Sequence, residues 1–577
     1  MPVSPFEASS SSVAGSVRLI RAVGDRAVLV ELPNLADVLD LQAHLQRHPL
    51  DGQLDVLAAA ETVLITGVSA SAACGFADAL RQLQVRPAAP ADATLVHIDI
   101  VYDGEDLTDV AAHTGLSIDG VIAAHTGQDW TAAFGGFAPG FLYLTGANAA
   151  LTVPRRSSPR SAVPAGSVAV AGDYSAVYPR ASPGGWQLLG RSDARLWDLE
   201  RAQPALIRPG NQVRFRAVRA QVAAARIVGA EIANATDGAE QDAATGPSAA
   251  TEATVTPDAA AEESGRPATL STPATGIRLL SPGAQTTVQD LGRPGYADQG
   301  VTGSGALDRG ALRRANRVVG NPATAAVLEN ALGGLSLTAL TDQVLAVTGA
   351  VLPVTVTDAA GRHRVLPMDS AVSLLAAETL SLGAPHTGVR SYVAFRGGID
   401  VPLVLGSRST DTLSGIGPAP LTPGTVVRML PAAPGSAVHH PEIPPPAPAE
   451  VTELRFVPGP RADWFEPASV ARFGAAEWTV TIQSNRIGLR LHGEPLTRSR
   501  AGELASEGTA RGAIQVPPSG LPVLFLADHP VTGGYPVIGV VLAEDLDLAA
   551  QLPTGARIRF TPLPAEPLPA EPLPVSL

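Results

Sequence analysis

A low-complexity stretch, residues 220–275, divides this chain into two halves. It is dominated by Ala, Thr, Pro, Glu and Asp, and it contains no aromatic residue. A segment of this composition buries too little apolar surface to offset the entropy lost on ordering, so we expect a flexible linker. The fold is therefore expected to consist of two separately folded halves, one on each side of the linker.

The first half is organised around one unusual stretch, Phe134-Gly135-Gly136-Phe137-Ala138-Pro139-Gly140-Phe141-Leu142-Tyr143-Leu144. It gathers Gly, Pro and aromatic residues in a chain that is only 4% aromatic. Gly lets another chain or a ligand approach closely, and Pro interrupts a regular strand ladder. On the residues alone, the favoured interpretation is a tight, aromatic-packed turn between strands.

The patterning elsewhere predicts a mainly β protein with a small α/β domain at its start. Hydrophobic spacing predicts helices over residues 35–48 and 71–83, and Gly24-Asp25 predicts a hairpin turn. Abundant Gly (57) and Pro (51) separate short apolar runs in the rest of the chain. This punctuation is typical of β-barrels or sandwiches.

Changes of composition suggest where the chain divides. The expected segments are a disordered tail (1–16), a small α/β domain (17–91), a β-barrel unit (92–219), the linker (220–275), a β-rich domain (276–430), a Pro-rich break (431–450), a second β-rich domain (451–561) and a disordered tail (562–577).

The sequence contains no lysine, so all 41 basic residues are arginines. This absence excludes a phosphate loop of the kind that needs Lys, lysine Schiff-base chemistry, and covalent attachment of biotin to this chain. The 41 basic and 54 acidic residues give a net charge of −13, with no basic stripe, so we expect no nucleic-acid partner.

The sequence also limits where the protein is expected to be located and what its single cysteine can do. No apolar run is long enough to span a bilayer, and residues 1–15 lack the pattern of a signal peptide, so we expect no membrane association and a cytoplasmic location. Cys74 is the only cysteine, which excludes intrachain disulfides and Cys-rich zinc sites. Its small-residue surroundings predict a buried, inert thiol.

Several arginines of the first half are candidates for anion binding. Arg155, Arg160 and Arg191 lie in short segments punctuated by Pro and Gly. A guanidinium can hold a carboxylate or phosphate through two parallel hydrogen bonds, whereas a surface Arg is as often merely solvated or ion-paired.

The second half offers carboxylates on comparable turns. Asp290 and Arg293 share one Gly/Pro-rich turn, while Glu507 and Asp528 lie in apolar neighbourhoods. We expect burial there to raise the pKa of Glu507 and Asp528 into a range useful for acid–base chemistry. The alternative for each residue is a carboxylate that caps a turn.

The ordered motifs of both halves resemble a known enzyme family. Segments from His125 to Arg191 resemble the B subunit of the prokaryotic ATP-dependent 5-oxoprolinase, a family that also includes a sporulation-kinase inhibitor. Segments from Ser281 to Phe560 resemble the C subunit of the same enzyme. The two modules are also similar to allophanate hydrolase subunits 1 and 2 and to the carboxyltransferase region of urea carboxylase. The whole chain thus resembles a fusion of the B and C subunits.

This resemblance implies a fold, an activity and a partner. The fold is a tandem of cyclophilin-like β-barrel domains after the small α/β domain. The activity is cleavage of 5-oxo-L-proline to L-glutamate driven by ATP hydrolysis, together with a separate 5-oxoprolinase A subunit. ATP, and Mg²⁺ with it, would bind at a location that the sequence does not reveal; no metal site of the chain's own is expected, and a homo-oligomer is compatible with the motifs.

The resemblance and the local chemistry together supply candidate site residues. The catalytic candidates are Asp290, Glu507 and Asp528. The candidates for binding substrate or phosphate are His125, Phe137, Pro139, Gly140, Arg155, Arg160, Gly184, Gly185, Trp186, Arg293, Gln515, Gly533, Gly534 and Tyr535.

The chain departs from the family pattern at two turns of the second half. After Asp411 the family continues with a Gly-rich turn that carries an Arg and then a Gly-Asp. In this chain, residues 415–420 contain no Arg, and Gly424-Thr425 stands in place of the Gly-Asp. Residues 528–531, Asp-His-Pro-Val, replace a more polar segment. In the first half, Trp130 stands where the family often has Tyr.

Two other functions stay open at this point. One is the carboxyltransferase component of a biotin-dependent urea or amide carboxylase, whose biotin would sit on another protein. The other is a binding module that inhibits a kinase. Neighbouring genes for the A subunit, for biotin carboxylase and carrier, or for a histidine kinase would separate the three.

Overall fold

The computed structural model describes residues 19–85, 94–158, 160–219, 276–446, 448–502 and 504–563. The expected linker 220–275, the expected tail 1–16 and all but the first two residues of the expected tail 562–577 lie outside these residues. The domain boundaries expected from the sequence therefore stay predictions, although Pro562 ends a strand rather than beginning a tail.

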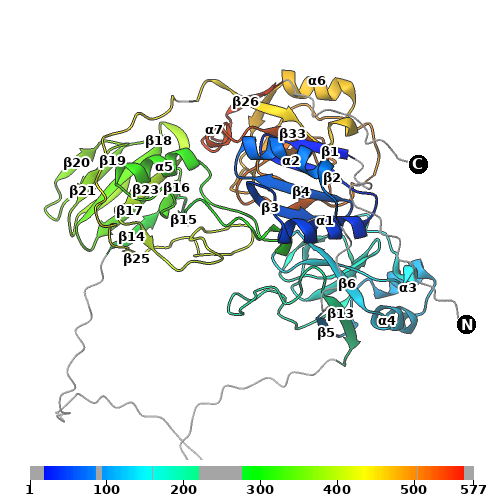
Figure 1. Cartoon of the computed structure of the whole chain (residues 1–577). Coiled ribbons are helices and arrows are strands. Elements are labelled where there is room, and N and C mark those ends of the chain that lie inside the picture. Colours follow the sequence, from blue (N-terminus) through cyan, green and yellow to red (C-terminus); the bar gives the residue numbers. More distant parts are fainter. Residues whose placement is uncertain are drawn as a thin grey trace, which may run out of the picture. The chain divides into compact units, whose positions relative to one another are not determined.

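The first sheet is antiparallel, with the strand order β1-β2-β4-β3 (Figure 1). Its elements are β1 (Leu19–Val23), β2 (Ala27–Glu31), α1 (Leu35–Arg47), β3 (Gln53–Ala58), β4 (Thr62–Gly67) and α2 (Ala70–Gln82). The predicted helices and the predicted hairpin at Gly24-Asp25 are confirmed. Asn34 and Ser69 cap the two helices through their side-chain oxygens, which accept backbone N–H groups at the third residue of each helix.

Both faces of this sheet are covered, which explains the continuous apolar runs of β2 and β4. Val28 and Val30 face the core shared with α1 and α2, whereas Ala27 and Leu29 face residues of the last barrel. Alternate side chains of a strand point to opposite faces, so a strand buried on both sides cannot alternate polar and apolar residues. Cys74, by contrast, is exposed on α2, so the predicted buried thiol is wrong.

The second sheet has the order β12-β9-β10-β7-β6-β13-β5, and a bridge between Val101 and Arg191 joins its two ends. Its first and last strands in sequence, β5 and β13, pair in parallel. Two helices, α3 and α4, pack against this sheet. The elements are β5 (Leu95–Ile100), α3 (Leu107–Thr114), α4 (Ile118–Thr126), β6 (Trp130–Gly135), β7 (Leu142–Thr145), η2 (Ala149–Leu151), β8 (Arg160–Val163), β9 (Ser167–Ala171), β10 (Tyr174–Val177), β11 (Ser182–Gly184), β12 (Gln187–Arg191) and β13 (Gln212–Ala217).

Residues 277–429 form two sheets over one apolar core, with α5 against the second sheet. The first sheet has the order β20-β19-β22-β17-β14-β25-β24, and the second has the order β15-β16-β23-β18-β21. The elements are β14 (Ile277–Pro282), β15 (Gln285–Gln289), η3 (Ala297–Gln299), α5 (Arg309–Val318), β16 (Val327–Ala331), β17 (Leu335–Ala339), β18 (Gln343–Val351), β19 (Val354–Thr357), β20 (His363–Leu366), β21 (Val372–Leu374), β22 (Thr379–Leu382), β23 (Thr387–Phe395), β24 (Ile399–Asp400) and β25 (Val426–Met429).

The last unit is a closed barrel, with the order β26-β33-β30-β31-β28-β27-β34, in which β26 and β34 pair in parallel. Its interior is filled by Trp478, Phe473 and Phe560, among others. The elements are β26 (Val451–Pro458), η4 (Ala462–Trp464), α6 (Pro467–Ala475), β27 (Glu477–Val480), β28 (Gly488–His492), β29 (Glu507–Gly508), β30 (Ala513–Gln515), β31 (Val523–Phe525), β32 (Thr532–Gly533), β33 (Val537–Val541), α7 (Leu546–Ala549) and β34 (Arg557–Pro562). The mainly β fold with a small α/β domain and barrel domains is thus confirmed.

The Pro-rich segment 431–450 carries no strand or helix in its described residues, but it is held against the preceding domain. Glu442 forms an ion pair with Arg317, and its backbone N–H donates to the carbonyl of Asp369 (2.9 Å). Arg396 donates to the carbonyl of Ser436 (2.7 Å). The segment therefore lies along the domain as a strap between the two β units of the second half.

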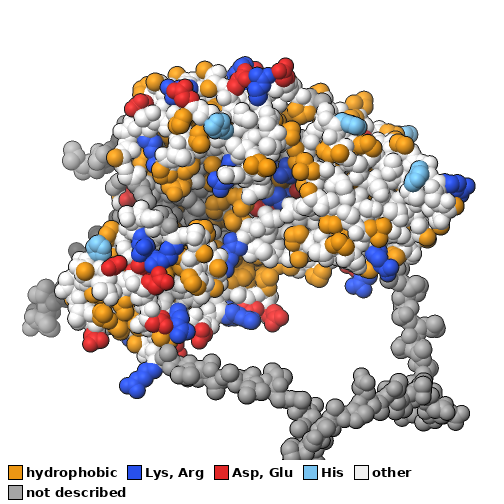
Figure 2. Space-filling view, turned by 180° about the vertical axis from the view of Figure 1, so that it is seen from behind, with side chains coloured by type: hydrophobic (Ala, Val, Ile, Leu, Met, Phe, Trp, Pro, Cys, Tyr) orange, Lys and Arg blue, Asp and Glu red, His pale blue; other side chains and the backbone are white. Residues whose placement is uncertain are grey.

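Charged side chains on the face shown in Figure 2 occur in small mixed groups, in which blue marks arginine because the chain has no lysine. Exposed pairs such as Arg214–Asp129 and Arg216–Asp99 belong to this kind, and each contributes little to stability. Within the described ranges, no helix has the length and apolar character needed to cross a membrane.

Candidate functional site

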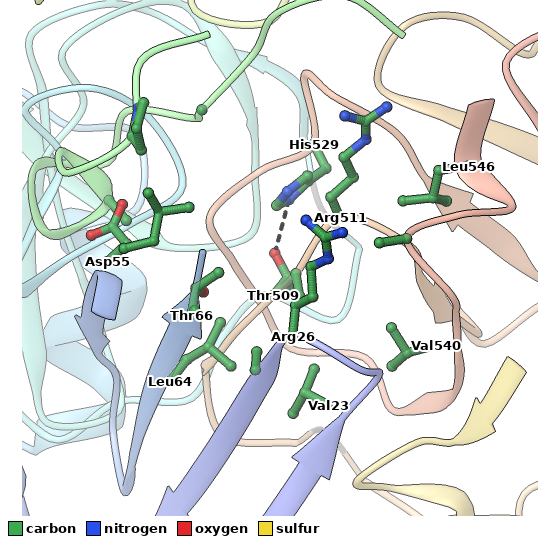
Figure 3. A pocket seen from close by; sticks show the side chains of 18 of the residues that line it. Val23, Arg26, Asp55, Leu64, Thr66, Thr509, Arg511, His529, Val540 and Leu546 are labelled. Atoms are coloured by element: carbon green, nitrogen blue, oxygen red, sulfur yellow. Dashed lines mark hydrogen bonds between the residues drawn. The ribbon is translucent and has the colours of Figure 1, made fainter. Parts of the chain in front are cut away.

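A cavity of about 440 Å³ lies between the outer face of the first sheet and the last barrel. Figure 3 shows Val23 and Leu64 on the sheet side, with Val540 and Leu546 across from them. Residues 291–303 and the start of α5 complete the wall. Both halves of the chain, separated in sequence by the expected linker, therefore contribute to one cavity.

The β1–β2 turn determines how closely the first sheet packs against the last barrel. Gly24 has φ +67, and a Cβ there would lie 2.8 Å from Val540 Cγ1, so glycine is needed for both the turn and the contact. The next residue, Asp25, accepts a hydrogen bond from the backbone N–H of Ala543 (3.2 Å). The hairpin is thereby fixed on the barrel, and Arg26 is left at the cavity.

One end of the cavity is basic. It is lined by Arg26, Arg309, Arg313 and Arg511. The pKa of Arg309 is lowered to about 9, first by burial and then by the charges of Arg511, Arg313 and Arg26. Asp547 is the nearby carboxylate, but its oxygens accept the backbone N–H groups of Arg309 (2.8 Å) and Gly310 (2.9 Å). The guanidinium charge at this end is therefore only partly compensated.

Asp55 is an acidic group on the side of the cavity opposite Arg511 (Figure 3). Burial raises the pKa of its carboxyl to about 6, and the neighbouring Asp298 acts in the same direction. Its oxygens accept the backbone N–H groups of Gly295 and Val56, both at 2.9 Å. A carboxyl with this pKa exchanges a proton near neutral pH, as a general acid or base must.

His529 and Thr509 lie between these two ends (Figure 3). Burial lowers the pKa of His529 to about 4, so its ring is neutral at physiological pH. Nδ1 donates to the carbonyl oxygen of Pro530 (2.9 Å), which leaves Nε2 as a hydrogen-bond acceptor. The cavity thus combines an apolar wall, a basic end, a titratable carboxyl and a neutral imidazole.

Asp528, a predicted catalytic residue, belongs to a different, fully occupied network. Its carboxylate accepts from Ser304 Oγ (2.7 Å), from Thr412 N (2.9 Å) and Oγ1 (2.7 Å), and from Arg486 Nε (2.9 Å). Although burial would raise the pKa of Asp528, Arg486 and these donors lower it, so the predicted raised pKa is wrong. Arg486 is also ion-paired with buried Glu329.

Asp290 and Arg293 hold neighbouring loops in a similar way. Asp290 accepts from Ser407 Oγ (2.6 Å), Ser409 Oγ (2.6 Å) and Arg408 N (2.6 Å). Arg293 is buried and donates to the carbonyl oxygens of Ser409 and Val404. Both side chains are turned toward residues 404–409, while the adjacent Leu291 and Pro294 line the cavity.

Glu507, the third catalytic candidate, bridges the two halves through an arginine. Arg461 Nε donates to Glu507 Oε1 (2.9 Å), and its Nη1 donates to Glu31 of β2 (2.5 Å). The pKa of Glu507 is raised, as expected, chiefly by burial. The Glu31–Arg461–Glu507 cluster joins the first sheet to the loop that leads to Thr509.

The Phe134–Leu144 turn also contacts the second half directly. The N–H of Phe137, a residue at φ 64, donates to Thr532 Oγ1 (3.0 Å), and the N–H of Gly140 donates to the carbonyl of Gln299 (3.0 Å). A Cβ on Gly136 would lie 2.2 Å from Thr532 Oγ1, so only glycine allows this contact. The predicted aromatic-packed turn is confirmed, and it also serves as an inter-module contact.

Around this junction the structure gathers several other predicted residues. Gly533 pairs with Glu507 in a short ladder, and Gln515 donates to the carbonyl of Tyr535 (3.1 Å). Gly534 follows Gly533 directly, and Pro139 lies within the Phe134–Leu144 turn beside Gly140. Trp186, preceded by Gly184 and Gly185, packs on Phe141 and Tyr143 with ring centroids 5.7 and 5.5 Å apart.

Two of the three predicted anion-binding arginines of the first half, Arg160 and Arg191, are engaged with carboxylates. Arg160 Nη2 donates to Asp106 (2.8 Å) and Glu105 (3.1 Å), and Arg156 pairs with the same Asp106. Burial raises the pKa of the Tyr143 and Tyr178 hydroxyls, and the nearby charge of Arg155 acts in the opposite direction. Arg191 pairs with Asp103 at the surface.

His125 is not brought to either site. It is fully buried, stacks on Phe215 at 4.4 Å, and both ring nitrogens have partners. Ser175 Oγ donates to a backbone carbonyl and accepts from Nε2 (2.8 Å), while the Tyr102 hydroxyl bonds Nδ1 (2.7 Å). Burial lowers its pKa to about 3.

Sequence reasoning missed Asp55, Arg309, Arg511, Thr509 and His529 as lining residues. Two of them stand one or two positions after a predicted residue: His529 follows Asp528 directly, and Thr509 lies two positions after Glu507. Within the described ranges, no group of three or more His, Cys, Asp and Glu side chains is placed to hold a metal ion.

Comparison with family models matches most of both halves. Residues 18–207 match the carboxyltransferase domain, subdomain C and D, and residues 299–562 match the carboxyltransferase domain, subdomain A and B.

Curated relatives match each half separately. The second half is 38% identical over 291 residues to the 5-oxoprolinase C subunit of Escherichia coli K12, covering 49% of this chain and 90% of that protein. Part of the first half is 46% identical over 127 residues to the 5-oxoprolinase B subunit of Escherichia coli O157:H7, covering 22% of this chain and 58% of that one. Urea amidolyase of Saccharomyces cerevisiae is 34% identical over 314 residues, 51% of this chain and 17% of that protein.

A solved structure matches both halves together. The crystal structure of TTHA0988 superimposes with a TM-score of 0.75 at 31% identity, covering 94% of this chain and all of that one.

Proposed function

Because the chain belongs to the carboxyltransferase-domain family that includes the 5-oxoprolinase B and C subunits, with both modules fused in one polypeptide, we propose that it is a component of an ATP-dependent 5-oxoprolinase. In this role it cleaves 5-oxo-L-proline to L-glutamate in the cytoplasm, coupled to ATP hydrolysis. It acts with a separate A subunit.

The observation that carries the proposal is the cavity built from both modules. Its sheet side comes from the half that resembles the B subunit, and its basic end comes mainly from the half that resembles the C subunit. A site of this kind exists only when the two modules are together, which gives a physical reason for their fusion. Its apolar wall suits the methylene face of a small ring.

The cavity residues match what opening of a lactam requires. The lactam is resonance-stabilised, and phosphorylation of its carbonyl oxygen by ATP makes the ring carbon electrophilic. The guanidinium groups of Arg309 and Arg511 offset the negative charge that develops on the phosphorylated oxygen at the reacting centre. Asp55, with a pKa of about 6, orients the water that adds to this carbon and takes its proton. The proton passes to the ring nitrogen as the C–N bond breaks, which leaves an acyl phosphate, and a second water then releases phosphate and L-glutamate. Mg²⁺, if used, accompanies the nucleotide.

The test is glutamate release from 5-oxoproline and ATP by the purified full chain, with and without the co-purified A subunit. We expect activity only when both proteins are present, and we expect Asp55→Asn to reduce kcat by about a hundredfold or more, within the range for a general base. Asp51→Asn, at an exposed position on the turn before β3, is the matched control. Full activity of Asp55→Asn, with folding verified by thermal melting, would remove Asp55 from the mechanism.

The similarity to urea amidolyase supports one second candidate, a carboxyltransferase acting on urea or another amide. Having no lysine, this chain would need biotin presented by another protein. Carboxylation of urea by the chain with biotin carboxylase and a biotinylated carrier, without glutamate release in the first assay, would favour this candidate. The third function considered from the sequence, inhibition of a kinase, has no structural observation in its favour.

A further inference from the structure

The basic end of the cavity contains guanidinium groups whose hydrogen-bonding capacity is largely unused. Arg309 donates no side-chain hydrogen bond to any other described residue, and its Nε is buried. Arg511 uses one nitrogen, Nη2, on the carbonyl of Leu307 (2.6 Å), while its buried Nε has no partner among the described residues. Buried polar groups in proteins are ordinarily satisfied, so unpaired donors on two arginines that line a cavity indicate a missing acceptor.

Three parts of the fold bring these arginines together. Arg309 and Arg313 lie four positions apart on α5 and so share one helix face. Arg511 precedes β30, and Arg26 comes from the β1–β2 turn. They lie close enough that Arg511, Arg313 and Arg26 each disfavour the charge on Arg309. Like charges repel each other, so these arginines stay close together only because the fold holds the three elements in place.

The local carboxylates do not neutralise this cluster. The carboxylate oxygen Oδ2 of Asp25 lies 3.7 Å from Arg26 Nε, and Oδ1 of the same carboxylate accepts a hydrogen bond from the Ala543 N–H. Asp547 lies under the start of α5 and is held by two backbone N–H groups. Asp547 acts on both Arg309 and Arg511 but is already occupied, and Glu329, whose charge also reaches Arg511, is ion-paired with Arg486.

We propose that Arg309 and Arg511, with Arg313 and Arg26 at the rim, form a subsite for a phosphate group. A phosphate presents three or more oxygens and up to about two negative charges, so it can accept from several guanidinium groups that approach from different elements. A single carboxylate has two oxygens and one charge, and it would leave donors unpaired. The proposal rests on the proposed function only for the origin of the phosphate, which there would be ATP.

The test uses inorganic phosphate and the full chain, by isothermal titration calorimetry without nucleotide or 5-oxoproline. We expect Arg309→Gln and Arg511→Gln each to weaken phosphate binding by about ten- to a hundredfold, the range for a charged hydrogen bond. Arg362→Gln, at an exposed arginine paired with Asp358, is the control and should bind as the unmodified chain does. Acetate is titrated in parallel as a carboxylate probe.

Three outcomes would overturn the subsite: no phosphate binding to the unmodified chain, unchanged binding in both variants, or acetate bound as tightly as phosphate. Thermal melting verifies that each variant is folded. Phosphate binding that depends on Arg309 and Arg511, in a chain that never releases glutamate with the A subunit, would keep the subsite and reject the 5-oxoprolinase activity. Glutamate release together with phosphate binding that the variants do not change would keep the 5-oxoprolinase activity and reject the subsite.

Discussion

Among the described residues, the network around Arg486 and the arginine cluster at the cavity differ in how completely their guanidinium groups are paired. In the network of Asp528, Arg486 and Glu329, each carboxylate has several donors and the guanidinium has two carboxylate partners. In the cavity, Arg309 and Arg511 keep donors without a partner among the described residues. The same residue types therefore serve two purposes: the paired group fixes loops of the second half, and the unpaired group is poised for a ligand.

The largest effect should follow from breaking the paired network. Arg486→Gln leaves the carboxylates of Asp528 and Glu329 buried without their guanidinium, and removal of one partner from such a pair costs about 3–5 kcal/mol. We expect equilibrium denaturation to show a decrease of this size in the free energy of unfolding. Arg490→Gln, at an exposed arginine in β28, is the control. A decrease below about 1 kcal/mol would show that the network is not what holds these loops.

A smaller effect is expected at the cluster that joins the halves. Arg461→Gln leaves buried Glu507 without its guanidinium partner and leaves Glu31 with Arg21 alone, and lost hydrogen bonds to charged groups cost about 1.5–3 kcal/mol. Arg472→Gln, which removes a surface pair with Glu494, should change the free energy of unfolding by less than about 1 kcal/mol. Equal effects of the two substitutions would mean that Arg461 contributes no more than a surface pair.

Acid should destabilise the protein through His125. Its folded pKa is about 3, whereas an unfolded histidine has a pKa near 6.5. Between these values the unfolded chain binds a proton that the folded chain excludes, so the free energy of unfolding falls as pH decreases. From pH 7 to pH 5 the contribution is about 2 kcal/mol.

Other titrating groups act in the same pH range. His529 acts in the same direction, and Asp55, with its raised pKa, acts in the opposite direction between about pH 4 and 6. Denaturation curves of His125→Asn should depend less steeply on pH than those of the unmodified chain. Parallel pH profiles of the two proteins would contradict the assignment.

The smallest effect on stability is expected at the unpaired group. Arg309→Gln removes a positive charge that three neighbouring arginines disfavour. It breaks no side-chain hydrogen bond to any other described residue. We expect the free energy of unfolding to stay within about 0.5 kcal/mol of the unmodified value, or to rise slightly. A decrease above about 2 kcal/mol would place Arg309 with Arg486 as a structural arginine.

The elements that the sequence predicted correctly are those that depend on residues close together in the chain. The helices α1 and α2, the β1–β2 hairpin and the Phe134–Leu144 turn follow from hydrophobic spacing and from turn residues. The start of α5 depends on the same local chemistry, since Asp308 accepts the N–H of Ala311 (2.7 Å) as a helix cap.

The cavity could not be predicted, because its residues meet only in the folded chain. Asp55 and Gly295, whose carboxylate and N–H are joined, are 240 positions apart. The predicted catalytic carboxylates were recognised as buried polar residues on turns, but the sequence does not show which side of a turn a side chain faces. Asp528 points into the paired network, and its neighbour His529 lines the cavity.

The parallel pairing of β5 with β13, and of β26 with β34, has a consequence for biosynthesis. Neither ring of strands closes until its final strand has left the ribosome, and pairings between distant segments form slowly. The sheet of β1–β4 is made first, yet its outer face, with Ala27, Leu29 and Leu64, packs against the barrel that is made last. This face should therefore stay uncovered during most of translation, when a chaperone can bind it.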